Sequence, residues 1–210
     1  MHEKKLIYRE NRLVNWDSQL KSAVSDLEVD YIEFKDGPEK IMVPGYDRKV
    51  DFGMFWEWAY QVEGSGEEIV IATTRPETMF GDSAVAVHPD DARYKAFHGK
   101  MLVHPITGRK MPIILDAELV DMEFGTGAVK VTPAHDPNDF LCGRRHKLEE
   151  ITIFTDEGAM AESKSRESKH GEGISSSNAT REQPLVAADT FMVFFKLMNC
   201  KTKDVQVIRP

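Results

Sequence analysis

The sequence predicts a mainly β fold, in which a barrel-like sheet carries α-helices at its periphery. Short apolar runs recur along residues 31–154 and are separated by turns that contain glycine or proline. Residues 52–62 alternate between larger apolar side chains and other residues, which is the period of a strand with one buried face. Two proline-led segments, beginning at Pro89 and Pro137, are the places where helices are expected in this region.

Residues 4–30 are predicted to form a lead-in that is helical or extended, with leucines and valines spaced for one partly apolar helical face. Strands are expected at residues 31–34, 41–43, 52–62, 69–72, 101–103, 113–115, 119–120, 128–131 and 151–154. Turns are expected at residues 36–38, 44–47, 64–66, 107–108 and 125–127, and the third of them closes a hairpin. Helices are expected at residues 89–99, ended by Gly99, and at residues 138–148.

The composition changes sharply after Met160. Serine, glycine and charged residues dominate residues 161–184, which cannot bury enough apolar area to offset chain entropy and are predicted to be disordered. Residues 191–195 form an apolar run that suits a helix, an edge strand or an aggregation-prone segment. The predicted organisation is a lead-in (1–30), a central domain (31–160) and a low-complexity or disordered tail (161–210).

The bulk properties of the 210 residues are those of a water-soluble protein, with 41% hydrophobic and 30% charged residues. No apolar stretch approaches the roughly 20 residues that span a bilayer, so no membrane association is expected. Cys142 and Cys200 show no metal-binding or disulfide spacing, which favours a reducing compartment. The formal net charge of −8 argues against a freestanding, high-affinity binder of nucleic acid.

Two polar segments stand out at predicted strand ends. Residues 71–78 read Ile-Ala-Thr-Thr-Arg-Pro-Glu-Thr, and residues 125–140 read Gly-Thr-Gly-Ala-Val-Lys-Val-Thr-Pro-Ala-His-Asp-Pro-Asn-Asp-Phe. They supply hydroxyls, a guanidinium, an ammonium and carboxylates at positions where side chains can converge on a small polar ligand. We expect the two segments to line opposite sides of one cleft.

These segments resemble the hydrolytic editing domain of the class I aminoacyl-tRNA synthetases for branched aliphatic amino acids, in its valine-specific form. Leucine-specific enzymes lack the Val-Lys-Val-Thr sequence that leads to the His-Asp element. Isoleucine-specific enzymes have other residues in place of Arg-Pro-Glu. Residues 12–16, 23–29 and 81–91 add to the resemblance, which runs from about Leu6 to Met160 and exceeds a chance motif match. The chain is therefore expected to be a truncated form of that family with an unrelated tail.

The resemblance implies hydrolysis of threonyl-tRNA(Val) by four candidate catalytic residues. Asp139 would bind the substrate ammonium, with its carboxylate oriented and kept ionised by free amides at the helix start. Asp136 would read the threonine hydroxyl. Lys130 and Thr132, two apart on one strand, share a face and would contact the hydroxyl and carbonyl region.

The candidate substrate-binding residues come mainly from the first segment. They are Thr73, Thr74, Arg75, Thr78 and His135. Arg75 suits a phosphate or a carboxylate, and Thr78 suits the exclusion of bulkier aliphatic side chains. His135 is a candidate for ordering a water. No side chain stands out as a general base, so water activation is expected to depend on the ribose hydroxyl of the substrate and on positioned donors.

No metal and no cofactor are expected for editing. ATP is implied only for the full-length family enzyme, because the sequence contains neither the His-Ile-Gly-His nor the Lys-Met-Ser-Lys-Ser element. The expected partners are the 3′ end of tRNA(Val) carrying a mischarged amino acid and the remainder of a synthetase. A cytoplasmic location is expected, with an organellar one left open.

Other interpretations of the same residues stay open. The chain could be a non-catalytic remnant or a tRNA-binding module, and His135, Asp136, Asp139 and His146 could form a metal-dependent hydrolase site. Arg75 could pair at the surface with Glu77 or Asp82, Lys130 could face outward, and Asp139 could be only a helix cap. The Trp56, Trp58 and Tyr60 stripe is expected in the core rather than as a base-stacking platform.

Overall fold

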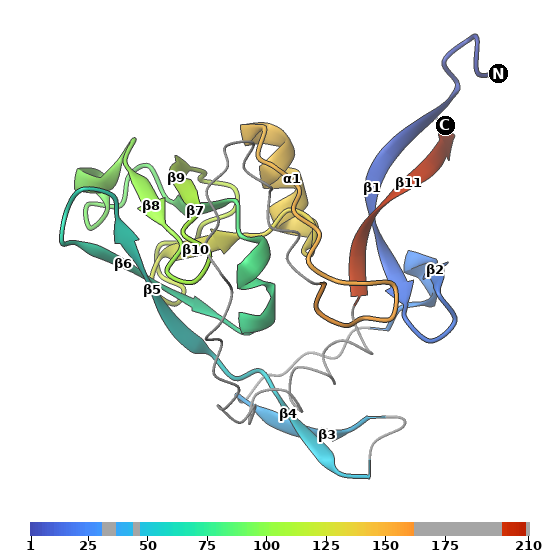
Figure 1. Ribbon diagram of the computed structural model, residues 1–210, viewed down its shortest axis with the longest axis horizontal. Helices are drawn as coiled ribbons and strands as arrows, with labels where there is room; N and C mark the ends of the chain where they lie inside the picture. The colour runs from blue at the N-terminus through green and yellow to red at the C-terminus, as the bar shows by residue number, and fades with distance from the viewer. Residues whose placement is uncertain (31–36, 44–46, 162–198, 209–210) are drawn as a thin grey trace, which may run out of the picture.

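The computed structural model describes residues 1–30, 37–43 and 47–161, together with the backbone of residues 199–208 (Figure 1). Its centre is a six-stranded sheet in the order β10-β7-β9-β8-β5-β6. The strands are β5 (Trp56–Val62), β6 (Glu68–Thr73), β7 (Ala84–Val87), β8 (Met101–Val103), β9 (Lys110–Leu115) and β10 (Ala128–Val131). The α-helix α1 (Pro137–His146) follows β10. The fold is mainly β with peripheral helices, as the sequence predicts.

The two edge strands of this sheet, β6 and β10, lie against each other, so the sheet curves into a nearly closed barrel. Its interior holds a cluster of buried side chains. The members are Tyr60, Val62, Ile69, Ile71, Val85, Val87, Leu102, Met111, Ile113 and Ala128. The curvature brings the end of β6 next to β10, and this proximity places the two polar segments together.

Strand β7 was missed by the sequence analysis. All four of its residues are fully buried because both faces are covered: Val85 and Val87 belong to the barrel core, and Ala84 and Ala86 pack towards Cys142 of α1. A strand buried on both faces loses the alternation that marks a half-buried one. It pairs in parallel with β9 and antiparallel with β10.

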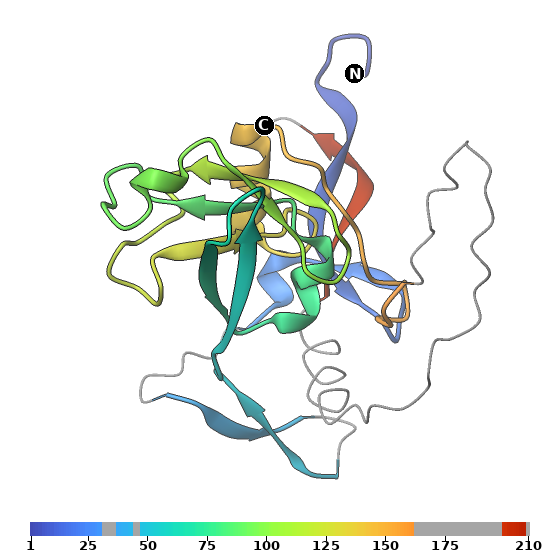
Figure 2. The same cartoon turned by 60° about the vertical axis from the view of Figure 1, so that its left-hand side comes forward.

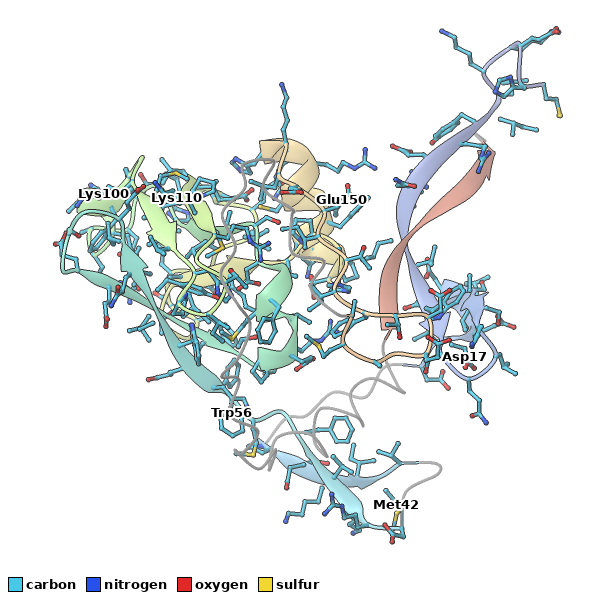
Figure 3. The ribbon with its side chains drawn as sticks, in the orientation of Figure 1. Asp17, Met42, Trp56, Lys100, Lys110 and Glu150 are labelled. Carbon is cyan, nitrogen blue, oxygen red and sulfur yellow. The ribbon has the colours of Figure 1, made fainter. Side chains whose placement is uncertain are left out.

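The alternating stretch at residues 52–62 is not one strand. Gly53 adopts φ +77°, and the chain breaks there into β4 (Lys49–Phe52) and β5. β4 pairs with β3 (Glu39–Met42) in a separate hairpin, which projects from the barrel (Figure 2). Trp56, at the junction between that hairpin and β5, is 51% exposed, so only the later part of the aromatic stripe is core (Figure 3).

The lead-in is extended rather than helical. It forms β1 (Ile7–Asp17) and β2 (Ser22–Val24), followed by a single 3₁₀ turn, η1 (Asp26–Glu28). β1 runs beside α1, where Arg144 Nη2 donates to the Asn11 carbonyl at 2.8 Å (Figures 1 and 2). β1 also pairs antiparallel with β11 (Asn199–Ile208), a strand that the sequence analysis did not predict.

Three further expectations were wrong. Residues 89–99 form turns and the 3₁₀ helix η3 (Lys95–Phe97), because the Asp91 carboxylate accepts the Arg93 amide and turns the chain. Residues 119–120 belong to no strand, because residues 117–119 form a turn whose amides at 118 and 119 donate to Asp116 Oδ1. Residues 151–154 lack a partner strand within the described chain and contribute only the bridge between Phe154 and Met160.

The other predicted elements were confirmed, allowing for small shifts at their ends. They are the strands at 41–43, 69–72, 101–103, 113–115 and 128–131, the hairpin of β5 with β6, and the helix at 138–148. Some predictions lie outside the described residues. They are the strand at 31–34, parts of the turns at 36–38 and 44–47, the disordered segment 161–184 after its first residue, and the apolar run at 191–195. In the described part of the chain, none of the helices has the length and apolar character needed to span a bilayer.

Candidate editing site

A cavity of about 450 Å³ opens between the end of β6, the strand β10 and the start of α1. Both polar segments contribute to its wall, as the sequence analysis expected. The lining residues are Phe55, Ala72, Thr73, Thr74, Arg75, Thr78, Leu119, Phe124, Val129, Lys130, Asp136, Asn138 and Asp139. Thr132 and His135 are the two predicted site residues that this lining does not include.

The threonine-rich wall is built by a turn at the end of β6. The strand ends at Thr73, whose Oγ1 accepts the Arg75 amide at 3.0 Å. The chain then enters the 3₁₀ helix η2 (Pro76–Gly81), where Thr78 Oγ1 donates to the Arg75 carbonyl at 2.9 Å. Hydroxyl-to-backbone bonds of this kind favour turns over continued strand, so the polar side chains gather where the sheet ends.

Arg75 joins the two segments. Its Nη1 donates to the His135 carbonyl at 2.7 Å, and its Nε lies 3.2 Å from Glu77 Oε1. The pairing with Glu77 was foreseen as a surface contact, but the Glu77 side chain is almost completely buried. A largely desolvated guanidinium with two partners holds the threonine turn against the segment that precedes α1.

Lys130 does not face outward. Its side chain is only 8% exposed, and its ammonium donates to Thr78 Oγ1 at 2.6 Å and to Thr132 Oγ1 at 2.7 Å. A third contact, to Asp82 Oδ1, is longer at 3.4 Å. The ammonium therefore supplies a fixed positive charge at the cavity wall, and the N–H aimed at Asp82 is the one most easily redirected to a ligand.

Asp82 anchors this network and was not predicted as a site residue. It is fully buried, and its two carboxylate oxygens accept separate hydroxyls at 2.5 Å each, from Thr132 Oγ1 and Tyr60 Oη. Burial and the neighbouring Asp82 charge raise the pKa of Tyr60, which keeps that hydroxyl a donor. The sequence signal was an acidic residue two positions before the apolar run of residues 84–87, which places a carboxylate at the start of a core strand.

The η2 turn is supported from the β8–β9 side. His104 is fully buried, with its Nε2 3.1 Å from the Met79 carbonyl and its Nδ1 accepting the Ile106 and Thr107 amides. This pattern assigns the proton to Nε2. Burial lowers the pKa of His104, so the ring stays neutral and holds Met79, the residue after Thr78.

Asp139 lines the cavity with a perturbed carboxyl group. Its Oδ2 accepts the Thr132 amide at 2.8 Å. Burial raises the pKa of Asp139 to about 7, although the Lys130 ammonium acts in the opposite direction. The expectation that helix amides keep it ionised was wrong, because those amides are bound by Asp136.

Asp136 is the N-cap of α1. Its Oδ1 accepts the Asn138 amide at 2.8 Å and the Asp139 amide at 3.1 Å, so the proposed cap role belongs to Asp136 and not to Asp139. Asp136 still lines the cavity. The lining holds two carboxylates, Asp136 and Asp139, and two cations, Arg75 and Lys130, and each cation has a buried carboxylate partner outside the lining, so the wall can receive a positively charged group of a ligand as well as a negatively charged one.

His135 does not reach the cavity with its side chain. The ring is fully buried, its Nε2 accepts the Ile153 amide at 3.0 Å, and it lies 4.5 Å from the Phe154 ring centroid. The expectation that it orders a water at the substrate is therefore corrected. Pro133 and Ala134 lie in a turn that is closed by the His135 amide donating to the Thr132 carbonyl at 3.0 Å. The imidazole therefore packs against Phe154 and not into the cavity.

Two aromatic rings form the rim of the cavity. Phe55 is 53% exposed and Phe124 is 64% exposed, and their ring centroids lie 5.8 Å apart in an edge-to-face arrangement. Exposed rings that line a polar cavity offer faces for stacking with a planar ligand group. The sequence analysis missed both residues because isolated phenylalanines carry no spacing signal.

The residues suggested for a metal-dependent hydrolase do not come together. Among the described residues, the group close enough to share an ion is Asp116, Cys142 and His146, whose two α1 residues lie nearer the end of that helix. Arg145 donates to both oxygens of Asp116 at 2.8 and 3.0 Å, and the Cys142 thiol donates to Oδ2 at 3.3 Å. A guanidinium already occupies the carboxylate, so this cluster fits an ion pair better than a metal.

Comparisons with known proteins give one consistent result. The family model of the leucyl-tRNA synthetase editing domain matches residues 89–191. Valine–tRNA ligase, mitochondrial 1, of Arabidopsis thaliana is 58% identical over 160 residues, which are 76% of this chain and 14% of that protein. The mitochondrial enzyme of Saccharomyces cerevisiae is 58% identical over 77% of this chain and 15% of its own length, and the human enzyme is 55% identical over 76% and 13%.

The chain thus spans about one seventh of the length of these curated relatives. A solved structure, the LeuRS–tRNA–LeuAMS ternary complex of Agrobacterium radiobacter K84, matches with a TM-score of 0.43 and 19% identity over 72% of this chain and 26% of that chain. On the sequence matches, the chain belongs to the editing domains of the class I aminoacyl-tRNA synthetases, in the form carried by valine–tRNA ligases.

Proposed function

We propose that this chain hydrolyses a mischarged aminoacyl ester at the 3′ end of tRNA, and that its substrate is threonyl-tRNA(Val). The observation that carries the proposal is the cavity shared by Thr78, Lys130 and Asp139, which joins a hydroxyl, an ammonium and a carboxylate on one wall. Membership of the editing-domain family supports the reaction class. The threonyl substrate follows from the problem that valine-specific enzymes face.

A valine-sized apolar pocket rejects threonine poorly, because exchanging a methyl for a hydroxyl preserves the shape. The valine-specific synthetase is the standard example of this limit, and a second, hydrolytic site is the standard remedy. In this chain the cavity wall around Thr78 and Asp136 offers partners for the threonine hydroxyl. Valine would leave those polar groups unpaired, and so it would be bound less well.

The cavity offers a partner for each polar part of the substrate. In the proposed complex, the Asp139 carboxylate binds the ammonium. Lys130 Nζ redirects its longest contact, the one to Asp82, toward the oxyanion that forms when water attacks the ester carbonyl. The terminal base stacks against the rings of Phe55 and Phe124 at the rim. Arg75 holds the threonine turn in position.

The reaction itself needs only water as a second reactant. Water adds to the ester carbonyl, the bond from that carbon to the ribose oxygen breaks, and the ribose oxygen takes up a proton. We assign water positioning to the neighbouring ribose hydroxyl of the substrate together with the cavity wall. Neither a metal nor a cofactor is required, and ATP would serve only the full-length enzyme.

The test is deacylation of threonyl-tRNA(Val) by the purified chain. Wild type is compared with Asp139→Ala and Lys130→Ala, and Leu141→Ala, an exposed residue of α1 outside the cavity, is the matched control. We expect Lys130→Ala to lose about 10²-fold or more in rate, the cost typical of removing a group that stabilises an oxyanion, and the control to keep its rate. Asp139→Ala should lose about 10- to 100-fold, because a hydrogen bond to a charged group is worth about 1.5–3 kcal/mol. Equal, slow rates for all four proteins would refute the proposal.

That negative result would favour the second candidate, a non-catalytic remnant or tRNA-binding module. Tight tRNA binding without turnover would identify it. Loss of hydrolysis on addition of a chelator would instead identify a metal-dependent hydrolase. Turnover of valine and ATP by this chain alone would contradict the assignment of aminoacylation to other parts of a synthetase.

The proposed compartment is the cytoplasm, with the mitochondrion as the alternative that two of the relatives suggest.

A further inference from the structure

The loop of residues 121–127 carries Phe124 to the cavity rim and leads directly into β10, the strand of Lys130. Inside the loop, the Asp121 carboxylate accepts the Glu123 amide at 2.9 Å, and the Phe124 carbonyl accepts the Gly127 amide at 3.1 Å. These short-range bonds shape the loop. Its position relative to the cavity depends on what holds it from outside.

Arg93 holds the loop from one side. Its Nη2 donates to the Met122 carbonyl at 2.7 Å and to Asp91 Oδ2 at 2.6 Å, and its Nε donates to Asp91 Oδ1 at 3.0 Å. Because the Asp91 carboxylate is buried, it holds the guanidinium in a fixed bidentate geometry. The same guanidinium binds the loop.

Tyr94 holds the other end of the loop. Its hydroxyl donates to the Thr126 carbonyl at 2.7 Å, and its ring packs against the barrel core. The Arg93 guanidinium lies over the same ring, 5.5 Å from its centroid. The two neighbouring residues thus tie both halves of the loop to the barrel.

Gly127 shows how closely the guanidinium approaches. A Cβ at this position would lie 2.2 Å from Arg93 Nη2 and 3.1 Å from Asp91 Oδ2, and the backbone has φ +74°. A side chain at this position would displace the Arg93 guanidinium, and the positive φ by itself favours glycine.

We propose that Asp91, Arg93 and Tyr94 form a clamp whose role is to position the 121–127 loop, and with it Phe124, for the terminal nucleotide of the substrate. These are positioning residues, since none of them lines the cavity. The kinetic part of this inference rests on the proposed editing function, whereas the structural part does not.

The structural part is tested by amide hydrogen exchange of the 121–127 loop in Arg93→Gln and Tyr94→Phe. The matched control is Arg144→Gln: Arg144 also binds a backbone carbonyl, pairs with Glu10 and Glu150, and lies over an aromatic ring, but far from the loop. We expect at least tenfold faster exchange of the loop in the two clamp variants and wild-type exchange in the control. Unchanged loop exchange in both clamp variants would overturn the clamp, whether or not the chain is active.

The kinetic part is tested by steady-state deacylation of threonyl-tRNA(Val). Base stacking on an aromatic ring is worth about 1–3 kcal/mol, or about 5- to 150-fold, and a displaced ring loses part of it. We expect Arg93→Gln and Tyr94→Phe to raise KM on the order of tenfold and to change kcat less than about twofold. Phe124→Ala should raise KM in wild type but add little in the Arg93→Gln background, because both changes remove the same contact.

The two hypotheses fail in different ways. A wild-type chain without deacylation would refute the proposed function, and the exchange experiment would still decide the clamp. An active wild type with additive effects of Phe124→Ala and Arg93→Gln, or a drop in kcat at constant KM, would refute positioning through Phe124.

Discussion

At the scale of single residues, the chemistry of the site rests on two buried carboxylates with different surroundings. Asp82 has the Lys130 ammonium and two hydroxyl donors, whereas Asp139 has one backbone amide and a more distant ammonium. A buried carboxylate that has few donors tends to take up a proton, as the raised pKa of Asp139 reflects. The two carboxylates therefore have different roles. Asp82 holds the side chains around it in position, and Asp139 lines the cavity in which a ligand would bind.

The raised pKa of Asp139, about 7, predicts a pH dependence of the reaction. Binding an ammonium requires the ionised carboxylate, so the deacylation rate at low substrate concentration should rise with pH and level off above about pH 7. Asp139→Asn should be slow and flat over the same range. A wild-type profile without a rise between about pH 5 and 7, measured with correction for spontaneous ester hydrolysis, would contradict the role of Asp139.

The same group predicts the opposite trend for stability. Its folded pKa lies above the unfolded value of 3.8, so its favourable contribution is present below about pH 4 and is lost as pH rises through about 7. The free energy of unfolding of wild type should therefore fall relative to that of Asp139→Asn between pH 4.5 and pH 7.5. Urea unfolding of both proteins at the two pH values gives this difference.

At the scale of elements, the position of α1 decides whether Asp136 and Asp139 meet the threonine turn. The helix begins at the Asp136 cap and is tied near its end to Asp116, which follows β9. Burial by itself raises the pKa of Asp116, but hydrogen bonds from Arg145, the Leu119 amide and the Cys142 thiol lower it to about 2. Asp116 is thus an anchor that holds the helix against the sheet.

Asp116→Asn should loosen this anchor. We expect a loss of about 1–3 kcal/mol in the free energy of unfolding, because a buried ion pair is broken while Arg145 stays partly solvated. The depressed pKa means that the contribution is present above about pH 4 and is lost as pH falls toward 2. The variant and wild type should therefore converge in stability on acidification, as followed by urea unfolding. A constant difference from pH 6 to pH 2.5 would show that the charge of Asp116 is not involved.

At the scale of the whole molecule, the acidic balance limits how the chain would engage tRNA in the proposed function. With a net charge of −8, it has few uncompensated cations for phosphate contacts, and in the proposed function recognition would depend on the terminal nucleotide and the amino acid. The β1–β2 segment, the β3–β4 hairpin and β11 lie outside the barrel (Figure 1).

This balance predicts a weak salt dependence. Proteins that make 6–10 phosphate contacts lose roughly 10³- to 10⁵-fold in affinity between 50 and 200 mM salt. For this chain we expect KM for threonyl-tRNA(Val) to rise less than about tenfold over that range, measured by deacylation at fixed pH. A steeper rise would reveal a phosphate-binding surface that the charge distribution does not suggest.

The sequence was sufficient for the fold class and for most of the polar residues that line the cavity, because both depend on local signals. Alternation marked the β5–β6 hairpin, Pro137 marked the start of α1, and hydroxyls at a strand end marked the threonine turn. Strand β7 was missed because burial on both faces removes alternation. The helix at 89–99 was wrong because Asp91 binds Arg93 instead of favouring a helical first turn.

What the sequence alone determined is the family, the mainly β architecture and the two segments that supply the polar groups. What only the tertiary structure decided is which of those groups face the cavity: Lys130 and Asp139 do, whereas the His135 side chain lies beneath it and Asp136 also caps a helix. The physical reason is that residue type and spacing are local properties. Burial, the partner of each carboxylate and the position of the Phe124 loop arise when β6 and β10 meet as the sheet curves.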